Sequence, residues 1–142
     1  MKFKFSLEPV LKVRKHKEKL QKQKLAEEIS RKKEIDELQQ EVKQQLNRYL
    51  QATQGQKVQN IHILKRQHSH VEQVHRRMKE LTGKLADAEK AVTNERQKLA
   101  EAHKSRHIME KMREFEQKRF VEKMAKQDQQ NMDEIATQSY SR

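Results

Sequence analysis

The sequence contains no cysteine and no tryptophan, and it has one proline and two glycines among 142 residues. Without cysteine, a disulfide framework and a thiolate metal site are both excluded. Sheets and loop-rich folds need turns every ~8–12 residues, built from Gly, Pro, Asn and Asp, and such turn material is scarce after Val10. No run approaches the ~18–20 consecutive apolar residues of a membrane-spanning helix. Sheet folds and spanning helices are therefore not expected.

Hydrophobic residues are also few, at 32% of the chain, whereas charged residues make up 38%. Globular domains usually carry about 45–50% apolar residues, so this chain cannot fill a compact multilayer core. The residues that dominate after Val10 are good helix formers, which predicts an almost wholly helical chain. Disorder is the competing class for such a composition, and the periodicity of the apolar residues decides between the two.

The second half of the chain carries that periodicity. Every seventh residue from Leu64, together with the residue three positions further on, forms a heptad series. Between Val71 and Ala102 nine of its ten members are apolar, the exception being Glu95. A 3.5-residue apolar repeat of this length predicts a left-handed coiled coil. We call the series the seam, meaning the residues that face the partner helix.

The first half predicts a partner helix with a less regular seam. Ser6 can cap its start, with Glu8 and Pro9 in the first turn. Between Val13 and Leu25 the only apolar residue is Leu20, which indicates a weak stretch. Periodicity is lost around Gly55, whereas Gly83 lies inside a regular heptad.

The predicted fold is all-α, a single antiparallel two-helix coiled-coil hairpin with a longer second helix. We expect helices over about 7–51 and about 58–137, a turn at about 52–58 and a polar tail at 138–142. From a rise of ~1.5 Å per residue, Phe5 should meet the second helix near residue 105, so that roughly a quarter of the chain has no internal partner. After Ala102 the register is expected to slip, with Ile108, Met112 and Phe115 forming a new stripe beside the old one. Such a break indicates either a shifted packing mode or a change of partner.

Three segments resemble the FliJ family of bacterial flagellar export proteins. They are the opening Phe-x-Phe-x-Leu-x-x-Val-Leu of residues 3–11, the charged helix of residues 109–114, and the ending Asn-Met-Asp-Glu-Ile-Ala of residues 131–136. The resemblance covers the whole length of the chain.

This resemblance implies a stalk similar to the central (gamma) subunit of rotary ATPases. FliJ proteins insert into the hexameric ring of the export ATPase FliI and promote its assembly and activity. They also contact the export gate protein FlhA and take part in substrate–chaperone traffic, with FliH and export chaperones as further partners. The implied location is the cytoplasm, at the inner face of the plasma membrane, and the charged start of the chain has no signal-peptide pattern. Tyr49 is the residue that we carry over as a gate contact.

We further expect both chain ends to form the tip that engages the ATPase ring. The reason is that their apolar residues extend over a greater length than one short partner helix can cover. The alternative is that the overhanging segment frays. The predicted ring contacts are Leu7, Val10, Leu11, Arg14, Ile108, Met112, Phe115, Phe120, Met124, Asp133 and Ile135.

No catalytic, cofactor or metal site is predicted. His103 and His107 have the spacing of a zinc pair, but the residues between them add positive charge and supply no general base. A two-helix rod also offers no pocket that excludes water. An enzyme is therefore not expected.

The net charge of +12 leaves several functions open. Residues 2–24 alone hold nine Lys and Arg against Glu8 and Glu18, a net of +7. Such a segment is compatible with a solvated helix face, or with attraction to an acidic ring entrance. The alternative function is a basic coiled coil that binds nucleic acid or an anionic membrane surface. Aromatic stacking platforms for single-stranded nucleic acid are absent.

Overall fold

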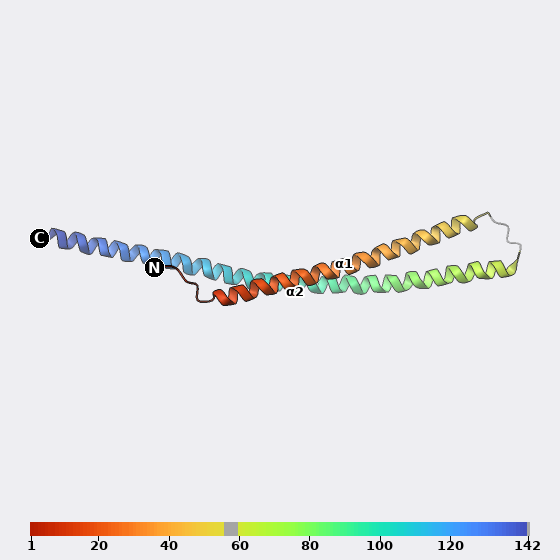
Figure 1. The fold of residues 1–142 in the computed structure, drawn as a ribbon, viewed down its shortest axis with the longest axis horizontal. Helices are drawn as coiled ribbons and strands as arrows, with labels where there is room; N and C mark the ends of the chain where they lie inside the picture. Colours follow the sequence, from red (N-terminus) through yellow and green to blue (C-terminus); the bar gives the residue numbers. More distant parts are fainter. Residues whose placement is uncertain (56–59, 142) are drawn as a thin grey trace. The chain divides into compact units, whose positions relative to one another are not determined.

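The computed structural model describes residues 1–55 and 60–141. Within them the chain forms two helices, α1 (Glu8–Thr53) and α2 (Ile61–Tyr140). The helices pack antiparallel and α2 is the longer, which confirms the predicted all-α hairpin (Figure 1). Neither helix, over the described residues, has an apolar stretch that could cross a membrane.

The helix ends differ slightly from the expected bounds. α1 begins at Glu8, where the Leu11 N–H donates to the Leu7 carbonyl at 3.0 Å. It is followed by Gly55 at φ 92°, a left-handed conformation that favours glycine after a helix. α2 begins at Ile61, after an N-cap by Asn60 whose side-chain oxygen accepts the His62 N–H at 3.1 Å. Residues 56–58 of the predicted turn and residue 142 of the predicted tail lie outside the described residues.

Contacts divide the chain into two units, each built from a piece of both helices. The turn unit is Gln21–Lys98, and the end unit is Met1–Leu20 with Leu99–Arg142. The single-domain organisation of the chain stays a prediction.

The turn unit buries the predicted seam of α2. Leu81 is 1% exposed and Val92 is 4% exposed. The other members of the predicted interface that are at least partly buried are Val71, Val74, Met78 and Leu85. Leu64 occupies the same register but is 50% exposed, so burial of the seam begins after it.

The end unit has a small hydrophobic cluster at the start of α1. Phe5, Leu11 and Met109 are buried together, and Phe3 and Leu7 pack against them. Phe5 thus meets α2 four residues beyond the position that helix length predicted. The segment before α1 acts as a short cover over the end of the seam.

Of the two explanations for the stripe after Ala102, a shifted packing mode within the hairpin is wrong, and a change of partner stays a prediction. Buried or partly buried positions continue in the old register at Arg106, Met109, Glu116 and Phe120. The stripe of Ile108, Met112 and Phe115 stays outside the seam and is 55%, 40% and 62% exposed. The register persists because Arg106 finds a buried acidic partner, as described below.

We predict that Leu81→Ala lowers the free energy of unfolding by about 2–4 kcal/mol, because it removes a fully buried side chain. Leu64→Ala is the matched control, since it changes the same residue type in the same register at a half-exposed position. Urea unfolding followed by circular dichroism measures both. Equal losses for the two variants would contradict the burial pattern.

Candidate partner-binding surfaces

The weak stretch of α1 between Val13 and Leu25 is a polar section of the seam. Arg14 Nη1 donates to the Ser105 carbonyl at 2.9 Å. Glu18 is 4% exposed, and its carboxylate accepts a hydrogen bond from Arg106 Nε and lies 3.2 Å from His103 Nδ1. The apolar residue of this stretch, Leu20, is 43% exposed and takes no part in the seam. Paired charges therefore replace aliphatic side chains here.

Arg106 pairs with one carboxylate on each helix, Glu18 of α1 and Glu110 of α2. Its Nη1 lies 2.7 Å from Glu110 Oε2, and Lys15 Nζ lies 3.9 Å from Glu110 Oε1. Hydrogen bonds to Glu18, and then to Glu110, raise the pKa of Arg106, so the guanidinium stays charged. A charge pair within a seam favours one register, because sliding the helices would leave each charge desolvated without its partner.

A second polar crossing lies in the turn unit. Gln21 Nε2 donates to both the side chain and the backbone carbonyl of Glu95, the one polar member of the regular heptads. The hydrogen bond from Gln21 lowers the pKa of Glu95, and Lys98 at 3.3 Å acts in the same direction; partial burial opposes both. The ionised carboxylate is thus the form that the folded state favours.

The structure divides the predicted ring contacts into two groups. Four of them make contacts within the hairpin. Leu11 is 0% exposed, and Leu7 packs against the cluster that contains it. Arg14 donates a hydrogen bond to the Ser105 carbonyl, and the Phe120 and Phe3 ring centroids are 5.6 Å apart. Leu11 is fully buried, whereas Leu7, Arg14 and Phe120 are partly buried, and their contacts hold the end unit together. Their role as ring contacts stays a prediction.

The remaining predicted contacts are accessible. Ile108, Met112 and Phe115 form a stripe on the flank of α2, with Arg119 5.8 Å from the Phe115 ring centroid. Val10 of α1 is 37% exposed. Further along α2, Met124 is partly buried and Asp133 and Ile135 are exposed. The two groups together show that the accessible apolar surface of the end unit belongs mainly to α2.

A shallow hollow lies beside the Phe3–Phe120 pair. Its volume is about 600 Å³, and its charged lining is mixed but mainly basic: Lys4, Arg119, Lys123 and Lys126 with Glu116 and Glu122. The segment before α1 forms one wall through Phe3. Its surroundings suit a partner with acidic side chains rather than an enclosed small molecule, because the hollow is open to solvent.

Tyr49, the predicted gate contact, lies in the turn unit. Its ring centroid is 4.5 Å from that of His70, and the rings are tilted by 60°. Tyr49 is partly buried, so one part of its ring packs and another remains accessible.

Over the described residues, no group of three His, Cys, Asp or Glu side chains is placed to hold a metal ion. The rings of His103 and His107 lie 6.1 Å apart and nearly parallel, and His103 is engaged with Glu18.

Sequence reasoning missed Phe5 as a core residue, and it missed the Glu18–Arg106 pair. A signal for the pair existed: counting heptads from Leu11 places Glu18 in the seam of α1, and counting from Leu64 places Arg106 in the seam of α2. Opposite charges in facing seams indicate pairing.

One family model matches nearly the whole chain. It is described as Flagellar FliJ protein, and it matches residues 3–142. No curated protein and no solved structure matches the chain significantly.

We predict that Glu18→Leu and Arg106→Leu each destabilise the hairpin more than the double substitution does. Each single change removes the cross-helix partner of a charge in the seam. Arg106 then keeps its contact with Glu110, or Glu18 keeps its contact with His103, whereas the double change removes both seam charges. Urea unfolding of the four proteins in a double-mutant cycle measures the coupling. Strictly additive effects would show that the pair does not set the stability of this section.

Glu95 generates a pH prediction. Because its pKa is lowered in the folded state, its contribution to stability is fully present above the ordinary carboxyl pKa and is lost as the pH falls through the lowered value. Glu95→Gln should therefore show a smaller loss of unfolding free energy between neutral and acid pH. The exposed Glu101→Gln variant is the control and should follow the unmodified protein.

Proposed function

This chain belongs to the FliJ family of flagellar proteins, and we propose that it acts in flagellar export as the stalk of an ATPase ring. The family is a non-catalytic component of flagellar export. In the proposal, the end unit inserts into the hexameric ring of FliI and promotes its assembly and activity. The stalk also couples the ring to the export gate protein FlhA and to substrate–chaperone traffic, on the cytoplasmic side of the membrane at the flagellar base.

The observation that supports insertion is the exposed apolar surface of α2 in the end unit. Phe115 is 62% exposed, Met132 is 69% exposed and Ile135 is 64% exposed. Large apolar side chains gathered on a helix without a partner usually mark a binding surface. Met132 and Ile135 lie beyond Phe120, which meets Phe3 of the segment before α1, whereas Phe115 lies on the flank of α2 within the contacted section.

Spacing on the last part of α2 also supports a ring partner. Val121 and Met132 are eleven residues apart, and so are Met124 and Ile135. An eleven-residue spacing aligns the two members of each pair along a nearly straight helix, so the four side chains form two neighbouring rows. One helix with side chains is ~10–12 Å wide, which suits a narrow central channel better than a helix pair does.

The charge of the chain start supports an acidic entrance. Residues 2–24 carry a net charge of +7, and Lys12 and Lys17 are exposed on α1. Complementary charge raises association rates and suppresses wrong partners, whereas apolar contacts supply most of the affinity.

Nucleic-acid binding is the competing function for a basic helix. Phe3 and Phe120 pair with each other, and Tyr49 pairs with His70, so these rings are engaged within the protein. The family match and the exposed aliphatic surface both favour a protein partner at the end unit.

Tyr49 is included in the proposal as the contact with FlhA. Its partly buried ring is held by His70, and this arrangement presents an aromatic surface at low entropic cost. This contact would leave the end unit free for the ring.

We predict that Met132→Ser combined with Ile135→Ser reduces stimulation of FliI ATP hydrolysis at least several-fold, because the ring loses its apolar contact. Ile29→Ser combined with Leu38→Ser is the matched control, since these side chains are 42% and 37% exposed on α1 within the turn unit. ATP hydrolysis by FliI is measured at increasing stalk concentration, and circular dichroism checks that both variants stay helical. Full stimulation by the Met132/Ile135 variant would refute the contact.

Tyr49→Ala separates the two parts of the proposal in the same assay. Tyr49→Ala should stimulate FliI normally but bind the cytoplasmic domain of FlhA more weakly. Tyr140→Ala is the control, since Tyr140 is 95% exposed near the end of α2, and its FlhA binding should not change. Equal FlhA binding by the two tyrosine variants would remove Tyr49 from the gate contact.

A further inference from the structure

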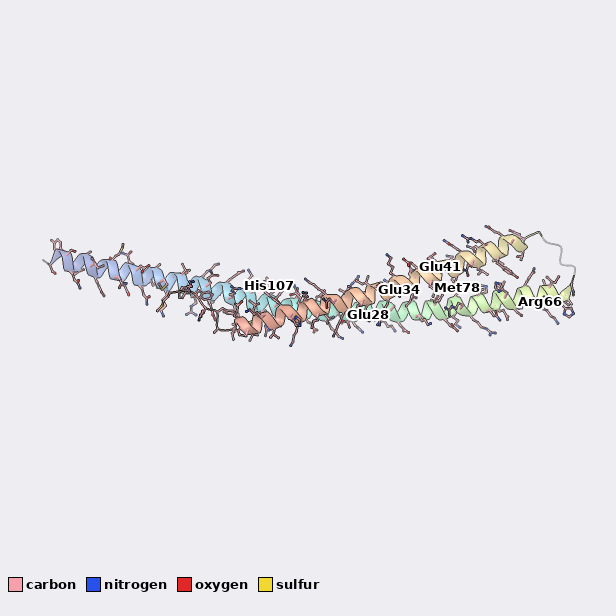
Figure 2. The ribbon with its side chains drawn as sticks, viewed as in Figure 1. Glu28, Glu34, Glu41, Arg66, Met78 and His107 are labelled. Carbon is pink, nitrogen blue, oxygen red and sulfur yellow. The ribbon has the colours of Figure 1, made fainter. Side chains whose placement is uncertain are left out.

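The end of the turn unit is strongly and unusually basic. We define the hairpin end as residues 42–55 and 60–79, which carry seven Lys and Arg against one carboxylate, Glu72. The adjacent residues 26–41 and 80–98 carry ten Asp and Glu against seven Lys and Arg. Figure 2 labels Glu28, Glu34 and Glu41 of these residues along α1, and Arg66 near the start of α2. The charge therefore changes from net −3 to net +6 within one unit.

The lone carboxylate of the hairpin end is itself engaged. Glu72 Oε1 lies 3.2 Å from His68 Nε2. Among the described residues of the hairpin end, Glu72 is the one carboxylate that could pair with its Lys and Arg side chains. That carboxylate already contacts His68. The positive charge of the Lys and Arg side chains is available to an external anion.

Exposed aliphatic side chains accompany the charge. Ile61 is 63% exposed, Ile63 is 47% exposed and Leu64 is 50% exposed, and Leu50 of α1 is 45% exposed. The Tyr49–His70 ring contact shows that the last turns of α1 and the first turns of α2 lie together. Lys65 and Arg66 follow directly on Leu64. Exposed aliphatic and basic side chains thus occur together within the first two turns of α2.

The first turns of α2 also bear a shallow hollow of about 570 Å³. Its lining is polar and contains no carboxylate: His62, Lys65, Arg66, Ser69, His70 and Gln73. Its ammonium, guanidinium and hydroxyl groups are the donors that phosphate oxygens accept from. The hollow provides room for anionic headgroups beside the aliphatic side chains.

We propose that the hairpin end docks on the surface of an anionic lipid bilayer. Ile61, Ile63 and Leu64 enter the boundary between headgroups and acyl chains, and Lys65 and Arg66 bind the lipid phosphates. Aliphatic side chains next to Lys and Arg are the combination that interfacial binding requires, and neither helix spans the bilayer. Nucleic acid fits the charge but gives these three aliphatic side chains no stacking partner. The proposal does not depend on insertion of the end unit into an ATPase ring.

The test uses the full chain and flotation with phosphatidylcholine vesicles that contain or lack phosphatidylglycerol. Binding should occur with phosphatidylglycerol and be weak without it. Lys65→Gln combined with Arg66→Gln should weaken binding roughly 10- to 30-fold, since each basic residue near an anionic surface contributes a several-fold increase in affinity. Lys12→Gln combined with Lys17→Gln removes the same charge from the end unit, and it should change binding much less.

Insertion is tested separately, because charge alone would also bind an acidic protein or RNA. The chain has no tryptophan, so Ile63→Trp introduces a single fluorophore into the proposed contact. Its emission should shift to the blue with phosphatidylglycerol vesicles and not with transfer RNA. Val121→Trp, at a 59% exposed residue of the end unit, should show no shift.

Several outcomes would overturn the proposal. They are absence of flotation with phosphatidylglycerol, equal loss of binding in the Lys12/Lys17 variant, and an emission shift as large for Val121→Trp as for Ile63→Trp. Tight binding of transfer RNA without vesicle binding would assign the basic surface to nucleic acid instead. None of these experiments measures stimulation of FliI. Failure of the bilayer proposal is therefore distinguishable from failure of the stalk function.

Discussion

A two-helix hairpin has only one seam, and each helix covers the other along a single narrow face. Everything outside that face remains in water, whatever the residue type. This constraint explains why so few side chains are fully buried, with Leu11 and Leu81 below 2% exposure. It also explains why Ile108, Phe115 and Met132 are accessible: no third layer exists within the described residues to cover them. Surfaces for partners are consequently a direct result of the architecture.

The polar section of the seam adds specificity to this simple interface. Apolar heptads alone tolerate shifts of one helix along the other, since each register buries similar area. Glu18 with Arg106, and Gln21 with Glu95, cross the interface in a way that one register satisfies. Replacing aliphatic residues by these pairs costs desolvation, and the compensating contacts with His103, Glu110 and Lys98 reduce that cost.

The two units present different chemistry to their surroundings. In the end unit, the accessible surface combines aliphatic, methionine and phenylalanine side chains with a helix of mixed charge. In the turn unit, the middle is slightly acidic, whereas the hairpin end joins basic residues to exposed isoleucine and leucine. A ring-binding stalk and a surface-docking end are separate functions, and the residues proposed for one do not overlap with those proposed for the other.

The sequence by itself determined the helical class, the hairpin near Gly55 and the seam from Val71 to Ala102. These follow from composition and from a repeat that depends only on local helix geometry. The same count also holds beyond Ala102, but it was interpreted as a slip because apolarity was taken as the mark of the seam and Arg106 was passed over. Only the tertiary structure decided which side chains face each other. It paired Glu18 with Arg106, buried Phe5 against Met109, and left Leu64 half exposed. Those outcomes depend on the register between two helices distant in sequence, where pairing of charges outweighs the hydrophobicity of single residues.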